Sequence, residues 1–190
     1  MKKLVHRVLY GSWLYTLGFG SFLPIIAAYQ GVLLGVTVIG IVTIVRQLVI
    51  ELLPLLKNYK YKNLYLAEVI YTSGYGAVIA MLVVFNCSLE MIAAVGCIGF
   101  IPYGLLLKAI NNKFNTMVSE YYTPKILEAI RFREAIIESR ASILAMAVTS
   151  GIAYYDPKSI IPVIVSVFII TIANLWSWYI YIDNIRKLRN

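Results

Sequence analysis

The stretch IIPVIVSVFIITIANLWSWYIYI occupies residues 160–182 and contains no charged side chain. A helix of about 20 predominantly apolar residues is long enough to cross the hydrocarbon core of a bilayer. The whole chain shares this character, because 61% of its 190 residues are hydrophobic, 14% are charged and the mean hydropathy is +0.79. Soluble domains carry about 25% charged residues. The sequence therefore predicts a membrane protein whose surface lies largely in lipid.

Five further apolar stretches, each bounded by turn or basic residues, precede this one. Together they predict an all-α bundle with spans at about residues 8–29, 32–54, 64–85, 89–107, 141–155 and 160–182. The first stretch is longer than the 7–15-residue core of a secretory signal peptide, so we expect it to be an uncleaved span. Asn86, Cys87 and Ser88 are predicted to form a tight turn between the third and fourth spans. We expect one integral membrane domain over residues 1–190.

The basic residues predict the orientation of these spans. All but two of the 17 lysines and arginines precede the first span, follow the sixth, or lie between spans two and three or four and five. The exceptions are Arg46 and Lys158. Because cytoplasmic loops are enriched in basic residues, both termini are predicted to be cytoplasmic. The net charge of +8 then reflects orientation rather than nucleic-acid binding. We expect a multi-pass protein of a bacterial inner membrane, with the lipid bilayer as its main partner.

The segment 108–140, between spans four and five, combines charged and apolar residues. Thr123 and Pro124 resemble an N-cap followed by proline at the first helical position. From there, apolar residues recur at helical spacing among charged ones. We expect an amphipathic cytoplasmic helix that lies along the inner leaflet and runs into span five. Its role is either that of a positively charged connector or that of a surface for a partner.

Several classes of chemistry lack the residues that they need. The only histidine, His6, is predicted on the opposite side of the membrane from Cys87, so no Cys–His pair can form. We likewise expect no histidine-rich zinc site and no Ser-His-Asp triad. Cys87 and Cys97 have neither metal-ligand nor disulfide-framework spacing. The sequence contains no phosphate-binding G-x-x-x-x-G-K-[ST] or dinucleotide-binding G-x-G-x-x-G motif. We expect no enzymatic activity, no cofactor and no metal.

Charged residues within the spans are the main candidates for function, because burying each costs about 2.5–3.5 kcal/mol or more at the bilayer centre. Arg46 and Glu51 lie in span two, and Glu68 lies about one turn into span three. Arg46 and Glu68 have similar predicted depths, so they could form a pair that gates or binds a substrate. In the alternative interpretation Arg46 extends to the headgroups and Glu68 is interfacial.

Small residues and prolines suggest how the spans pack. Gly18 and Gly20 lie in span one with Pro24, and Pro102 lies in span four. Proline can interrupt a membrane helix where it lines a cavity, and small residues let helices approach closely. These four residues are therefore predicted to shape a cavity, although close helix packing alone would use the same residue types.

The chain resembles one six-helix half of a major facilitator superfamily transporter. The similarity lies in Leu23-Pro24 late in span one, the series Gly96-x-x-Gly99-x-x-Pro102, and the basic entry RFREA at residues 131–135 before span five. The resemblance implies transport of a small solute or peptide. Because such transporters need two six-span halves to enclose a site, it also implies a homodimer or another membrane subunit. The alternative is a non-catalytic immunity protein that protects against a membrane-active toxin or bacteriocin by binding between the spans.

Overall fold

The computed structural model describes residues 2–29, 52–156 and 160–188, and these ranges contain helices and turns but no strand. The long helices are α1 (Lys2–Tyr29), α3 (Tyr61–Val84), α4 (Leu89–Ser119), α5 (Pro124–Tyr155) and α6 (Ile161–Ile180). A short 3-10 helix, η1 (Leu53–Leu56), precedes α3, and a π-helical turn, η2 (Tyr181–Ile185), follows α6. The predicted all-α fold is confirmed for the described residues. Most of the predicted second span lies outside them.

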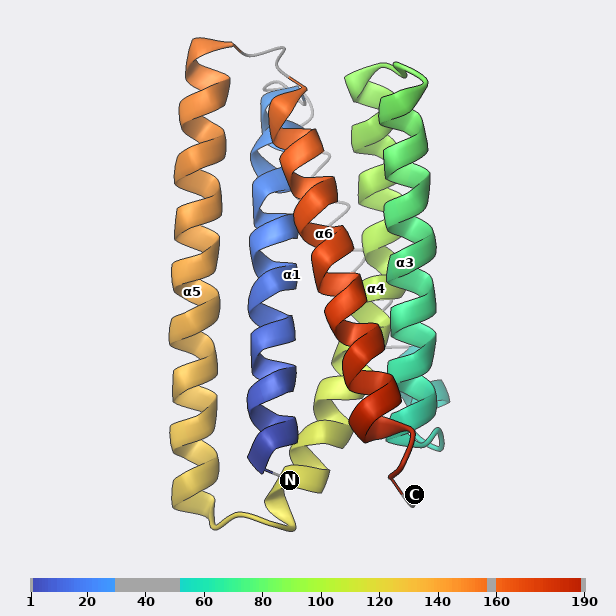
Figure 1. The fold of residues 1–190 in the computed structure, drawn as a ribbon, viewed down its shortest axis with the longest axis vertical. Coiled ribbons are helices and arrows are strands. Elements are labelled where there is room, and N and C mark those ends of the chain that lie inside the picture. The colour runs from blue at the N-terminus through green and yellow to red at the C-terminus, as the bar shows by residue number, and fades with distance from the viewer. Residues whose placement is uncertain (1, 30–51, 157–159, 189–190) are drawn as a thin grey trace.

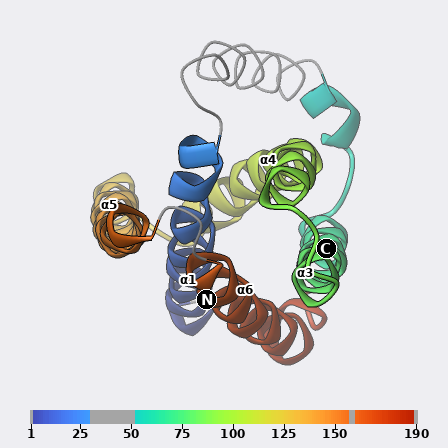
Figure 2. The same cartoon turned by 90° about the horizontal axis from the view of Figure 1, so that it is seen from above.

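The long helices form a bundle in which α1 packs against α5 and α6, and α3 packs against α4 and α6. Seen from above, α1, α4, α3 and α6 surround a common centre, and α5 lies outside them against α1 (Figure 2). The starts of α1, α3 and α5 share one end of the bundle with the ends of α4 and α6 (Figure 1). We call this end the basic end, because the predicted cytoplasmic lysines and arginines gather there.

Three stretches of helix in the described part of the chain are long and apolar enough to cross a membrane. They are Tyr61–Val84, Pro124–Ile152 and Ile161–Ile185. Their outward faces carry large apolar side chains, such as Phe168 at 65% exposure and Leu175 at 66%. A soluble domain rarely exposes a continuous surface of this kind. This part of the fold is therefore that of a membrane protein.

The turn between α3 and α4 has the predicted position and an identifiable cause. Asn86 adopts a left-handed backbone with φ of 52°, a conformation that asparagine tolerates better than most residues. The Asn86 N–H donates to the Val83 carbonyl at 3.1 Å, and the Cys87 N–H donates to the Leu82 carbonyl at 2.9 Å. This is the Schellman arrangement that closes helix ends. Ser88 then caps α4 by accepting from the Met91 N–H at 3.3 Å.

Segment 108–140 is divided between two long helices. Its first part continues α4 to Ser119, and its second part belongs to α5, which begins at Pro124 with Thr123 as its N-cap residue and runs unbroken to Tyr155. The start at Thr123 and Pro124 is confirmed, and the helix runs into the predicted span five as expected. Leu127 and Ile130 of this segment pack against the core of the bundle, and one continuous helix keeps its backbone hydrogen bonds.

The predicted interruptions at the prolines are not found. Pro24 lies within α1 and Pro102 within α4, and both helices continue through them. Proline removes one helical hydrogen bond, but neighbouring helices in a membrane bundle can satisfy the freed carbonyl. Pro102 is also exposed, so its ring does not face the centre of the bundle.

Candidate functional site

Polar side chains occupy one buried face of α3. Tyr61, Tyr65, Glu68 and Thr72 follow one another at intervals of four, three and four residues, which places them on the same side of a helix. They are all buried, with Glu68 at 5% exposure and Thr72 at 0%. This row begins at the basic end and leads toward the middle of the bundle. It gives an otherwise apolar helix a polar inner face.

Hydrogen bonds connect this face to α1 and α6. The Tyr15 hydroxyl of α1 donates to Oδ1 of Asn174 in α6 at 2.6 Å and lies 3.2 Å from Oγ1 of Thr72. Nδ2 of Asn174 donates to the Thr72 carbonyl at 3.2 Å. Oγ1 of Thr72 also donates to the Glu68 carbonyl at 2.9 Å. We call Tyr15, Glu68, Thr72 and Asn174 the polar cluster, and it joins three helices.

Glu68 is the ionisable member of the polar cluster. Its side chain is buried at 5% exposure, in the same bundle interior as the buried side chains of Tyr15, Tyr61 and Tyr65. Within residues 2–29, 52–156 and 160–188, no lysine or arginine forms an ion pair with it. A buried carboxylate needs a proton, a cation or several hydrogen-bond donors to offset the lost hydration. Its position therefore suits the binding of a proton or of a positively charged group.

The Tyr61 hydroxyl extends this chemistry toward the basic end. Among the described residues it is the buried side-chain polar atom without a hydrogen-bond partner. Its ring lies 6.0 Å from the ring of Tyr65. A buried hydroxyl of this kind can bond to water or to a ligand. No group of three histidine, cysteine, aspartate or glutamate side chains in the described chain could hold a metal ion.

The structure describes some of the predicted site residues, whereas others lie outside the described ranges. Glu68 lies in the polar cluster and is buried. Arg46 and Glu51 lie outside the described residues, so their predicted roles and the pair between Arg46 and Glu68 stay predictions. Gly20 lies on α1. Gly18 lies in a tight contact, where an added Cβ would stand 2.7 Å from Cγ1 of Ile170 on α6.

Sequence reasoning missed Tyr15, Thr72 and Asn174. A signal was present, because Asn174 is the one amide in the apolar stretch 160–182 and Thr72 follows Glu68 by one helical turn. The two tryptophans of α6 bond to neighbouring helices. Nε1 of Trp176 donates to the Arg7 carbonyl at 3.0 Å, and Nε1 of Trp178 donates to Oγ of Ser73 at 3.1 Å.

A cluster of charges joins the start of α1 to the end of α6 at the basic end. Arg7 donates to Asp183 in an ion pair, and its guanidinium lies 5.1 Å from the centre of the Tyr179 ring. Lys187 lies 3.7 Å from the other Asp183 oxygen. These contacts hold α6 against α1 between the polar cluster and the basic end. They fix the relative positions of the helices that carry Tyr15 and Asn174.

We expect Tyr15→Phe to lower the free energy of unfolding by about 1–2 kcal/mol. The substitution removes the donor to Oδ1 of Asn174, which is 7% exposed. Reversible unfolding in mixed micelles measures the change. Tyr10→Phe is the control, because Tyr10 is on the same helix and 48% exposed. Equal losses in both variants would mean that the bond to Asn174 contributes no stability.

Comparison with known proteins finds no family model that matches the chain, no similar curated protein and no similar solved structure. The geometry of the polar cluster is therefore the basis for a functional proposal.

Proposed function

We propose that this chain is a multi-pass protein of a bacterial inner membrane that moves, or helps to move, a small solute through the bundle by way of the polar cluster. One observation carries the proposal: a carboxylate, Glu68, is buried beside a hydrogen-bonded threonine, tyrosine and asparagine from three helices. Ionisable groups inside membrane bundles are costly and mark substrate or proton pathways. A purely structural core would gain stability from an apolar residue at this position.

The chemistry of the cluster indicates the class of solute. A carboxylate attracts a proton or a cationic group, and the hydroxyl and amide side chains offer further hydrogen bonds around it. The row from Tyr61 to Thr72 on α3 provides polar positions between the basic end and this centre. A proton, an inorganic cation or a small amine is therefore the kind of solute that the cluster suits.

The proposal also includes the orientation of the bundle in the membrane and its association with a second subunit. The basic end faces the cytoplasm, because basic segments are retained on that side. In this proposal the bundle serves as one half of a transporter with two repeats, in which substrate sites lie where the repeats meet. We therefore propose that the protein works as a homodimer or with another membrane subunit. Arg46 and Glu51 would add charge near the same pathway.

Cysteine accessibility tests whether the polar cluster opens to water. In a protein with Cys87 and Cys97 replaced by serine, we expect Thr72→Cys to react with a membrane-impermeant thiol reagent. Val69→Cys is the matched control, because Val69 and Thr72 are both 0% exposed and lie on the same helix. A pathway requires Thr72→Cys to react at least about tenfold faster, since an open population of a few per cent is enough to expose it.

Equal and slow labelling of both cysteines would contradict the proposal. It would leave the cluster as a closed structural network and favour the alternative of an immunity or interaction protein. Labelling of Thr72→Cys from the cytoplasmic side, the periplasmic side or both would further show which face of the bundle opens.

A further inference from the structure

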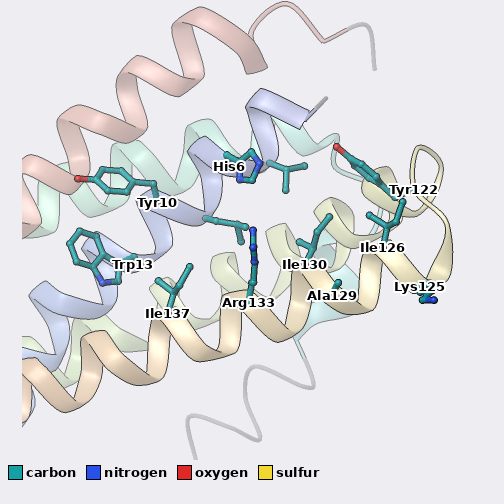
Figure 3. A pocket seen from close by; sticks show the side chains of 12 residues that line it. His6, Tyr10, Trp13, Tyr122, Lys125, Ile126, Ala129, Ile130, Arg133 and Ile137 are labelled. Carbon is teal, nitrogen blue, oxygen red and sulfur yellow. The ribbon is translucent and has the colours of Figure 1, made fainter.

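A groove separates α1 from α5 at the basic end. Its volume is about 900 Å³, and it is lined by α1 between Val5 and Trp13 and by the preceding turn and α5 between Tyr122 and Ile137. Figure 3 shows Trp13 of α1 and the side chains of Ile130, Arg133 and Ile137 of α5 between the two helices. Deeper in the bundle, Oγ of Ser12 on α1 donates to a carboxylate oxygen of Glu138 on α5 at 2.5 Å. This bond joins the two helices at the inner limit of the groove.

The groove has a basic lining with no acidic residue in it. Its charged or titratable members are His6, Lys125 and Arg133, which are all exposed. Arg133 extends from α5 across the groove toward α1, where His6 lies (Figure 3). Within the described part of the chain, neither Lys125 nor Arg133 forms an ion pair. The nearby carboxylates of Glu134 and Glu138 line a different pocket, which α4 shares, and that of Glu138 is bonded to Ser12 at the inner limit of the groove.

The groove is polar at its outer end and apolar deeper in the bundle, as a lipid leaflet is polar at its headgroups and apolar at its acyl chains. The 32 residues of α5 extend about 48 Å at 1.5 Å per residue, whereas the hydrocarbon core is about 30 Å thick. Counting about 20 residues back from Tyr155 places Arg133 at the opposite edge of that core. The same count from Tyr29 places His6 about one turn outside it. Trp13 and Ile137 then lie deeper, at the level of acyl chains.

We propose that this groove binds one anionic phospholipid of the inner leaflet. Its phosphate lies between Arg133 and His6, Lys125 adds positive charge at the outer rim, and an acyl chain lies against Trp13 and Ile137. Charge complementarity identifies the occupant, because basic pockets between membrane helices on the cytoplasmic side bind anionic headgroups. The site is separate from the polar cluster and does not depend on the proposed transport function.

Quenching of Trp13 by brominated lipids tests the site. The protein is placed in phosphatidylcholine vesicles that contain increasing fractions of brominated phosphatidylglycerol or, in parallel, brominated phosphatidylcholine. The difference between the protein and its Trp13→Phe variant isolates the signal of Trp13. We expect half-maximal quenching at a fraction of brominated phosphatidylglycerol at least about fivefold below that of phosphatidylcholine, because each basic residue near anionic lipid contributes about that factor.

Variants of the basic residues separate a specific site from general surface charge. In Lys125→Gln/Arg133→Gln, the two quenching curves should coincide within about twofold. The control Arg131→Gln/Arg140→Gln removes the same charge from the same helix outside the groove and should keep the preference. The proposal is wrong if the unchanged protein shows no preference, or if the control loses it equally. It is also wrong if neither lipid quenches Trp13, since protein would then cover the groove.

Discussion

Glu68→Gln is expected to stabilise the folded protein by about 1–3 kcal/mol. Glutamine keeps the shape of the side chain and removes the charge, and Glu68 is 5% exposed with no ion pair in the described part of the chain. The same change should slow labelling of Thr72→Cys, because each 1.4 kcal/mol that favours the closed bundle lowers the open population about tenfold. Reversible unfolding and the labelling rate measure the two effects.

A substitution that stabilises the protein but reduces the opening of the bundle shows that the original residue is kept for function. The control is Glu138→Gln, because Glu138 hydrogen-bonds to Ser12 at the surface between α1 and α5 and lies outside the polar cluster. It should leave the labelling rate unchanged. If Glu68→Gln instead destabilised the protein by about 3–5 kcal/mol, an unpaired buried cation would be the cause. Recovery of stability by Arg46→Gln in that variant would identify Arg46 as the partner.

Gly18→Leu is expected to destabilise the protein by about 3 kcal/mol. Gly18 is where α1 approaches α6, because a Cβ there would lie 2.7 Å from Cγ1 and 3.3 Å from the backbone nitrogen of Ile170. Oγ of Ser166 donates to the Gly18 carbonyl at 2.6 Å, so the helices cannot separate without breaking this bond. The same interface between α1 and α6 contains the hydrogen bond between Tyr15 and Asn174. Unfolding in mixed micelles measures the stability.

Two other glycines provide the comparison for Gly18. Gly74 on α3 and Gly151 on α5 have no atom within 4 Å of an added Cβ. Gly74→Leu and Gly151→Leu should therefore be neutral or slightly stabilising, since helical glycine costs about 0.5–1 kcal/mol relative to alanine. If Gly18→Leu lowers the free energy of unfolding no more than Gly74→Leu and Gly151→Leu do, the close packing of α1 on α6 is contradicted.

The sequence alone determined the class of the protein and the local ends of several helices. Long apolar stretches predict membrane helices because the solvent around them is apolar, and basic residues predict which ends gather together. The turn at Asn86 and the start of α5 at Pro124 follow from the conformations that these residues and their neighbours allow. Each of these signals acts within one or two turns of helix. For that reason it can be read without knowing the neighbouring helices.

Only the tertiary structure decided which side chains meet. In a soluble helix the buried face is apolar and the outer face is polar, but a membrane helix is apolar on both faces. The pattern of α3 therefore did not show that Glu68 and Thr72 point inward, nor that Tyr15 and Asn174 lie opposite them. The sequence of 124–140 predicts a helix that runs into span five, as found, but only the packing shows that α5 lies against α1.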